Sequence, residues 1–247
     1  GAPAKEVIFL LHGLNERDWK KYLTWAYKLQ KDTGKSVLLF PLSFHMERAP
    51  VEWSASRLMN EVAKERANLI PDLRFSSYAN SALSTRLNFE PERFFLSGIQ
   101  SLFDIVQLVD EVKEGNNKYI DKNAQIDFLG YSAGAFLGEL LFMVNPKNYF
   151  DSSKLLMICG GSVIEETYPC SKAILDTEAA KVFREYYLND FETSVSRNNY
   201  LTELFNKYED IGIIFKSMLS FDKNKSLRNS LLKGLNKRIF VIGLEKD

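Results

Sequence analysis

Short apolar runs alternate with segments of helical periodicity along most of this chain of 247 residues. That alternation is typical of βα units, in which parallel strands form a sheet covered by helices. The first two runs are continuously apolar, which indicates strands that are buried on both faces. The five predicted strands cover residues 7–11, 36–42, 125–129, 155–159 and 238–242.

Segments with apolar residues at every third or fourth position connect these strands, and that spacing predicts helices. The helical segments cover residues 18–31, 51–69, 92–113 and 133–144. Residues 71–91 are polar and rich in Ser and Asn, so we predict an irregular segment there.

A long helical region rich in aromatic residues, 165–233, separates the fourth predicted strand from the fifth. It shows no strand pattern of its own. We therefore predict a single α/β domain over residues 1–247, with a mostly parallel sheet flanked by helices. Residues 162–236 would form a helical cap inserted within it. We expect the cap to pack over the carboxyl edge of the sheet, with most of its aromatic side chains in its own core.

A candidate nucleophile, Ser132, lies in the sequence GYSAG at residues 130–134, directly between a predicted strand and a predicted helix. A serine hydroxyl becomes a strong nucleophile only when a neighbouring base removes its proton. The G-x-S-x-G turn projects the serine from a strained corner, where Gly130 and Gly134 avoid collisions. The pattern predicts a nucleophile elbow. The alternative is a tight turn whose serine caps the helix.

The loop after the first strand has the sequence HGLN at residues 12–15. Beside a nucleophile elbow, this loop and the residue after the serine each supply one backbone N–H to an oxyanion hole. The predicted donors are the N–H groups of Leu14 and Ala133, and Gly13 lets the loop approach a substrate carbonyl. An ordinary loop in which Asn15 caps the next helix is compatible with the same pattern.

Acidic residues follow the last predicted strand, where the sequence ends GLEKD. An acid at this place would lie at the carboxyl edge of the sheet, where it could orient a catalytic histidine. Asp247 is the candidate acid and Glu245 the second choice. A solvated acidic loop is the alternative.

These residues together resemble the α/β-hydrolase superfamily, with a closer likeness to an uncharacterised bacterial branch of it. The resemblance covers nearly the whole chain and rests on four segments: HGLN at 12–15, GYSAG at 130–134, CGG at 159–161 before the helical insertion, and RIFVIGLEKD at 238–247. It implies an α/β-hydrolase-like fold and a triad in the order serine, acid, histidine. It also implies that His12 supports the oxyanion hole.

The third member of that triad has no counterpart after the serine, because the sequence has only His12 and His45. Three interpretations stay open. The histidine lies beyond Asp247, or His45 at the carboxyl edge serves as a displaced base, or the protein is an inactive relative that binds a ligand in the old pocket. For both histidines, a structural hydrogen-bonding role is the simpler interpretation.

Composition narrows the function classes. Lys plus Arg and Asp plus Glu each number 32, so the formal charge is zero and no basic footprint for nucleic acid is expected. No apolar run approaches the roughly 20 residues that span a bilayer. We find no metal-ligand spacing and no dinucleotide motif, so we expect no metal and no cofactor. We expect a cytoplasmic protein with a small-molecule acyl substrate.

The sequence therefore predicts a serine-dependent hydrolase of an ester or related acyl bond, acting through an acyl-enzyme. A catalytically inactive binding protein with the same fold is the alternative. The fold does not select between ester, thioester, peptide and lipid substrates.

Overall fold

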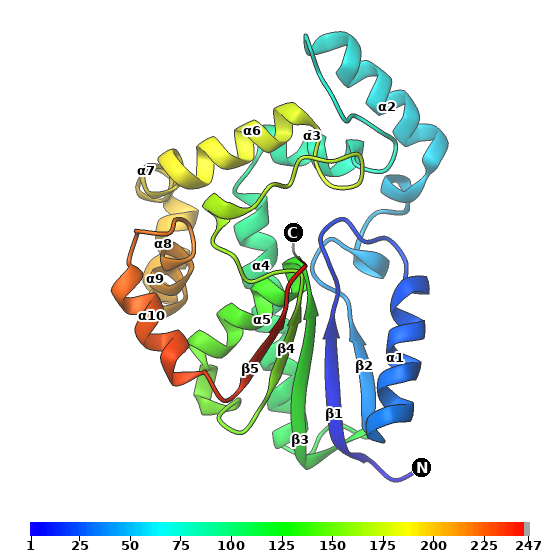
Figure 1. Ribbon diagram of the computed structural model, residues 1–247, viewed down its shortest axis with the longest axis vertical. Coiled ribbons are helices and arrows are strands. Elements are labelled where there is room, and N and C mark those ends of the chain that lie inside the picture. The colour runs from blue at the N-terminus through cyan, green and yellow to red at the C-terminus, as the bar shows by residue number, and fades with distance from the viewer. Residues whose placement is uncertain (245–247) are drawn as a thin grey trace. The chain divides into compact units, whose positions relative to one another are not determined.

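A computed structural model describes residues 1–244, and the predicted α/β class is confirmed (Figure 1). Five parallel strands form one sheet in the order β2-β1-β3-β4-β5, flanked by helices. The strands are β1 (Ala4–Leu11), β2 (Ser36–Phe40), β3 (Ile120–Tyr131), β4 (Leu155–Ile158) and β5 (Ile239–Ile242). Because all five strands are parallel, their carboxyl ends meet at one edge of the sheet, where ligands bind in open α/β sheets.

The chain divides into two compact units. The sheet unit contains residues 1–48, 98–161 and the chain from 229 onward, and the helical unit contains residues 49–97 and 162–228. The insertion predicted at residues 162–236 overlaps the second segment of the helical unit, residues 162–228. The structure adds residues 49–97 to that unit.

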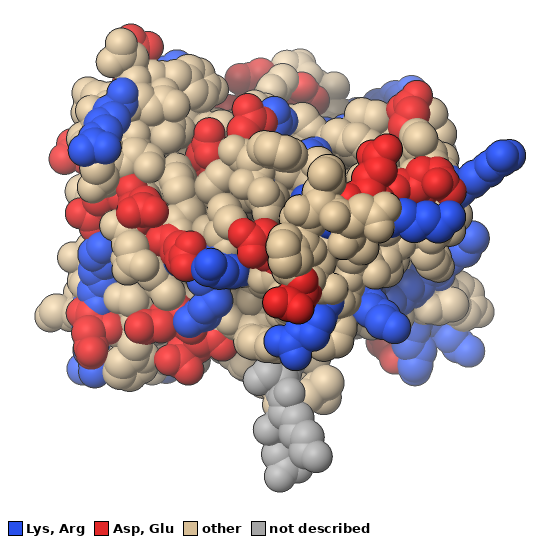
Figure 2. All heavy atoms as spheres, turned by 90° about the horizontal axis from the view of Figure 1, so that it is seen from above, with Lys and Arg blue, Asp and Glu red and all other residues tan. Residues whose placement is uncertain are grey.

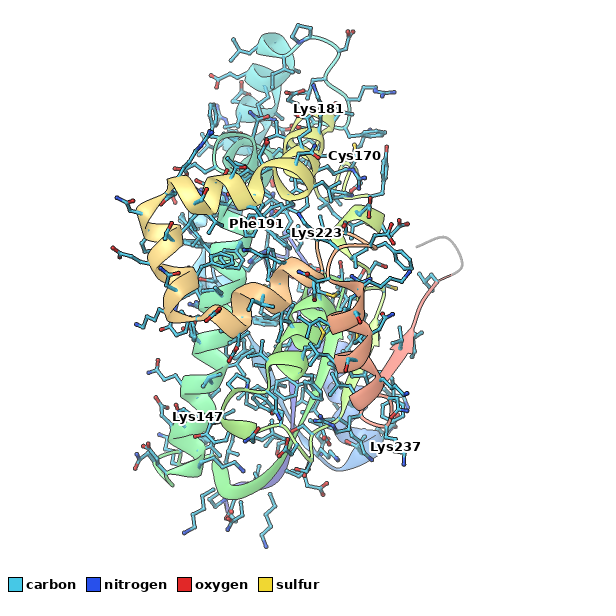
Figure 3. All side chains as sticks on the ribbon, turned by 90° about the vertical axis from the view of Figure 1, so that its left-hand side faces the viewer. Lys147, Cys170, Lys181, Phe191, Lys223 and Lys237 are labelled. Atoms are coloured by element: carbon cyan, nitrogen blue, oxygen red, sulfur yellow. The ribbon has the colours of Figure 1, made fainter. Side chains whose placement is uncertain are left out.

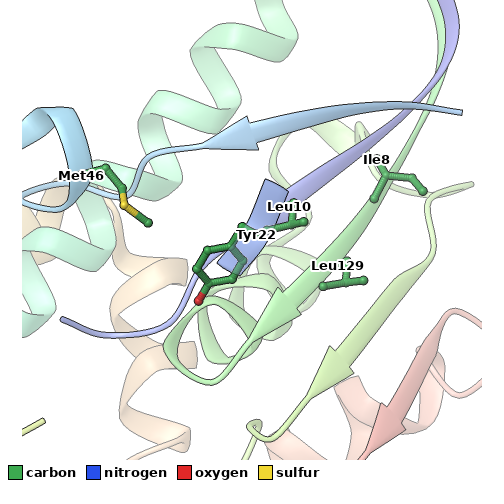
Figure 4. Close-up of a cluster of buried hydrophobic side chains, with 5 residues drawn as sticks. All are labelled: Ile8, Leu10, Tyr22, Met46 and Leu129. Carbon is green, nitrogen blue, oxygen red and sulfur yellow. The ribbon is translucent and has the colours of Figure 1, made fainter. Parts of the chain in front are cut away.

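One face of the sheet packs on α1 (Lys20–Thr33). Figure 4 shows the centre of this core, in which Ile8 and Leu10 of β1 lie with Leu129 of β3, Tyr22 of α1 and Met46. These strand residues occupy alternate positions, as expected when one face of a strand meets a helix. The position of Tyr22 in this core fixes α1 close to the end of β1.

The other face of the sheet carries an aromatic core. Phe9 of β1 and Phe128 of β3 have ring centroids 5.3 Å apart, and Phe128 also meets Phe142 and Phe150 edge-on. Phe142 belongs to α5 (Ala133–Val144), the helix that directly follows β3. The remaining sheet-unit elements include most of α4 (Arg93–Lys113) and two 3₁₀ turns, η1 (Met46–Arg48) and η3 (Pro146–Asn148).

The helical unit is built around a cluster of aromatic rings. Phe191, labelled in Figure 3, lies within 5.3–5.8 Å of five other rings by centroid distance. The predicted aromatic core of the insertion is therefore present. The helices are α2 (Ser56–Leu69), α3 (Ser81–Phe89), α6 (Thr177–Glu185), α7 (Phe191–Arg197), α8 (Asn199–Lys207), α9 (Glu209–Ser217) and the start of α10 (Lys225–Gly234), with 3₁₀ turns η2 (Val51–Ser54) and η4 (Ile164–Glu166) and a π turn, η5 (Tyr186–Asp190). The rest of α10, from Asn229, belongs to the sheet unit.

One local prediction is wrong. Residues 71–91 were expected to be irregular, but α3 occupies Ser81–Phe89. Two serines of this helix are buried and satisfied by other segments: the Ser81 hydroxyl donates to the Met59 carbonyl at 2.9 Å, and the Ser84 hydroxyl accepts from the Asp176 N–H at 3.0 Å. Tertiary hydrogen bonds thus offset the weak helix propensity of these residues.

On the face shown in Figure 2, basic and acidic side chains are interspersed. Within residues 1–244, no helix is both long enough and apolar enough to cross a bilayer.

Candidate active site

Ser132 occupies the corner between β3 and α5 with an unusual backbone conformation. Its φ is 52° and its ψ is −116°, far from the regions that a serine ordinarily adopts. Such strain persists only where the surroundings impose it, and it is common at functional sites. Here the Ser132 N–H donates to the Ile158 carbonyl of β4 at 2.9 Å, and the Ser132 carbonyl accepts from Ala135 at 2.9 Å. These bonds hold the corner between the sheet and the helix.

Three glycines make room for this corner. A Cβ at Gly130 would lie 2.6 Å from the Gly134 oxygen, and one at Gly134 would lie 2.3 Å from the Leu11 oxygen. Gly160, after β4, is equally constrained, because its Cβ would lie 2.6 Å from the Ser132 oxygen. The sequence pattern identified the first two. Gly160 was noted only within the CGG segment, and its role depends on strand order, which the sequence does not show.

The N-terminus of α5 presents Ala133, the predicted oxyanion donor. Ala133 is the first residue of the helix, so its N–H has no acceptor within the helix. Among the residues that the structure describes, no other group accepts from it. The partial positive charge of the helix N-terminus favours an anion at this place.

The HGLN loop lies against the same corner. A Cβ at Gly13 would lie 3.0 Å from the Tyr131 ring and 3.5 Å from the Ser132 Cβ, so only a residue without a side chain leaves the space beside the serine open. The Gly13 N–H donates to the Tyr22 hydroxyl at 2.9 Å, and the Asn15 N–H donates to His45 Nε2 at 3.1 Å. For the Leu14 N–H between them, no acceptor is present in the described part of the chain.

His12 is fully buried beneath this loop. Its Nδ1 donates to the Gly13 carbonyl at 2.8 Å, and its Nε2 accepts from the Leu42 N–H at 3.0 Å, which defines a neutral tautomer. Burial, and next the neighbouring His45, lowers the pKa of His12 to about 3. This geometry supports the role expected for His12, which is to support the loop.

His45 also bonds to the backbone through both ring nitrogens. Its Nε2 accepts from Asn15, and its Nδ1 donates to the Ser43 carbonyl at 2.9 Å. The side chain is buried, with the whole residue 8% exposed. These partners support a structural role for His45, since a base for Ser132 would need a ring nitrogen directed at the serine hydroxyl.

The candidate acids Asp247 and Glu245 lie outside the described residues. The sequence reasoning did not find Tyr22 and Glu16, which also contribute to this region. Their separation of six residues has no motif character, and only the packing of α1 brings them to the loop. Within residues 1–244, no group of three His, Cys, Asp or Glu side chains could hold a metal ion.

A family model described as "Family of unknown function (DUF6051)" matches residues 2–247. No curated protein matches the sequence.

Proposed function

The chain belongs to this family of unknown function over residues 2–247. From the geometry of its site, we propose that the protein is a serine hydrolase of ester or related acyl bonds, with Ser132 as the nucleophile. The observation that carries the proposal is the strained φ of 52° at Ser132, between two backbone N–H groups that lack acceptors in the described chain. A serine that served only as a helix cap would not need a positive φ. Nor would it need three neighbouring glycines at positions where any Cβ would collide with the backbone.

The proposed reaction follows the usual steps of acyl transfer. The Ser132 Oγ attacks the substrate carbonyl carbon while a base takes its proton, and the carbonyl oxygen becomes an oxyanion. The N–H groups of Leu14 and Ala133 are the proposed donors to that oxyanion. The leaving group departs with the proton, and water then releases the acyl group and regenerates the Ser132 hydroxyl. The proposed substrate is a small molecule with an ester or related acyl bond.

The proposed general base is a histidine that these 247 residues do not include, oriented by Asp247. Both histidines of the sequence have each ring nitrogen hydrogen-bonded to the backbone, which argues against either as the base. The same observation favours a second candidate function. A protein with no further histidine would keep the elbow and the oxyanion loop and bind an acyl or anionic ligand without turnover.

A fluorophosphonate probe tests the proposal on the protein as its natural host produces it. The probe reacts with activated serines and leaves a covalent adduct that intact mass spectrometry detects. We expect one adduct on the unsubstituted protein and none on Ser132→Ala. Ser162→Ala, which removes an exposed serine four residues after the end of β4 in the sequence, should label normally.

Absence of any adduct on the natural protein would overturn the hydrolase and leave the binding protein as the function. An adduct that persists in Ser132→Ala would overturn Ser132 as the nucleophile. The mass of the unmodified polypeptide, measured in the same spectrum, shows whether residues beyond Asp247 are present to supply a histidine. A mass that ends at Asp247 together with labelling would overturn the proposed base.

A further inference from the structure

We infer that Tyr22, held by Glu16, is a positioning residue that aims the Leu14 N–H at the oxyanion. The inference rests on the proposed function and adds to it the group that orders the loop before substrate binds. The side chain of Tyr22 comes from α1, eight residues beyond Leu14, and its hydroxyl inserts between the loop and a carboxylate.

The N–H groups of three successive loop residues differ in whether they have an acceptor. The first and third, those of Gly13 and Asn15, donate to Tyr22 and His45. The middle one, that of Leu14, finds no acceptor among residues 1–244. Tyr22 and His45 therefore fix the two peptide planes on either side of the Gly13–Leu14 peptide, which carries the Leu14 N–H. The loop can present one donor to a ligand without ordering itself at the moment of binding.

Tyr22 itself is rigid. It is fully buried, and its ring meets Trp19, Trp25 and Tyr131 at centroid distances of 5.4–6.4 Å. Figure 4 shows the ring beside Leu10 in the core between α1 and the sheet. A hydroxyl on such a ring cannot follow the loop if the loop moves. It therefore acts as a fixed acceptor.

Glu16 sets the direction of the Tyr22 hydrogen. The Tyr22 hydroxyl donates to Glu16 Oε1 at 2.8 Å, which leaves its oxygen lone pairs for the Gly13 N–H. Glu16 is in turn paired with Lys21 of α1. Burial is the main cause that raises the pKa of Tyr22, and the Glu16 carboxylate raises it further, so the phenol stays protonated and keeps this direction.

This arrangement matches what a pre-organised oxyanion site requires. Donors that are fixed before charge develops do not have to reorganise when the tetrahedral intermediate forms, and removing such a donor costs about 10²–10³-fold in rate. Loosening a donor without removing it should cost less. Loss of the Tyr22 hydroxyl should thus slow the chemical step and leave initial binding unchanged.

The test compares Tyr22→Phe with Tyr27→Phe, which removes an exposed hydroxyl from the same helix. The measurement is the phosphonylation of Ser132 by a fluorophosphonate, resolved into the limiting rate kinact and the binding constant KI. For Tyr22→Phe we expect kinact to fall roughly 10-fold with KI within about 2-fold, because the loosened donor acts on the transition state. Tyr27→Phe should match the unsubstituted protein.

Glu16→Ala provides a second variant in case Tyr22→Phe fails to fold, because the Glu16 side chain is partly exposed. It should lower kinact several-fold in the same manner. Equal kinact values for the unsubstituted protein and whichever of these variants folds would overturn the positioning role and leave the hydrolase intact. No labelling of the unsubstituted protein would overturn both. A variant that changes KI and kinact together would also contradict the inference, since it would indicate general disruption.

Discussion

Each of the two units buries a network of polar side chains. The two networks differ in the groups to which these side chains hydrogen-bond. In the helical unit, Arg66 of α2 makes a bidentate pair with Asp176, with N–O distances of 2.8 and 3.0 Å. Asp176 also accepts from the Ala179 N–H at the start of α6. In the sheet unit, the buried groups beneath the loop at residues 12–15 are uncharged rings. They bond to the loop backbone rather than to each other, and Tyr22 makes one further bond to the Glu16 carboxylate.

Under the proposed function, the first network stabilises the fold and the second prepares a site. The Arg66–Asp176 pair joins segments that are 110 residues apart, and its charges satisfy each other. The rings of His12, Tyr22 and His45 instead bond to the Gly13 carbonyl, the Gly13 N–H and the Asn15 N–H, whereas the Leu14 N–H has no acceptor in the described part of the chain. Breaking a buried ion pair lowers the free energy of unfolding. Neutral side chains that hold the loop instead leave the dipole of the Leu14 N–H available for a ligand.

The largest expected effect is the loss of stability in Arg66→Met. Removing the guanidinium leaves the Asp176 carboxylate buried without its cation, and breaking such a pair costs about 3–5 kcal/mol. Urea denaturation followed by circular dichroism measures this loss. The matched control is Lys64→Met, which breaks the exposed pair between Lys64 and Glu61 on the same helix.

The control should change the free energy of unfolding by less than about 1 kcal/mol, because exposed pairs contribute little. Equal losses of unfolding free energy in the two variants would mean that the buried pair contributes no more to stability than the exposed pair. The contrast between the two networks would then lose its energetic basis.

The next effect is the pH dependence of stability that follows from the buried, neutral ring of His12. The pKa of His12 falls from its ordinary 6.5 to about 3 on folding, first through burial and then through His45, whose ring centroid is 5.1 Å away. The folded state therefore binds the proton more weakly than the unfolded chain. The stability that the neutral ring contributes is complete above pH 6.5 and is lost as the pH falls toward 3.

Between pH 6.5 and 4.5, one such group lowers the free energy of unfolding by about 2–3 kcal/mol. His12→Gln removes this titration, so its stability should fall less over the same interval. Urea denaturation of both proteins at the two pH values measures the difference. Parallel losses in the two proteins would contradict a buried, neutral His12.

The sequence was sufficient to predict the sheet and the tight strand–turn–helix at Ser132. Continuous apolar runs such as residues 7–11 have few alternatives to a buried strand, and all five predicted strands are present. Residues 120–124 of β3 were not predicted, because Asp121, Lys122 and Asn123 interrupt the apolar pattern. The turn at Ser132 was predictable because its glycines are close in sequence to the serine that they serve.

What the sequence could not provide were contacts between distant segments. Helix α3 depends on hydrogen bonds from Ser81 to Met59 and from Asp176 to Ser84, and no local pattern encodes them. The roles of Tyr22 and Gly160 likewise follow from the packing of α1 and β4 beside the elbow. The sequence shows both histidines, but it does not show which backbone groups their ring nitrogens bond to.

The smallest expected effect tests how closely α5 must approach the loop that carries the open donor. A Cβ at Gly134 would lie 2.3 Å from the Leu11 oxygen and 2.6 Å from the His12 oxygen, so Gly134→Ala must displace backbone. Overpacking of this kind costs about 1–3 kcal/mol. Gly98→Ala in α4 meets nothing within 4 Å and should stabilise by up to about 1 kcal/mol, since alanine favours helix. Thermal unfolding compares the two. A Gly134→Ala protein as stable as Gly98→Ala would show that the helix tolerates a wider separation, and the close contact between the elbow and the loop would not be required.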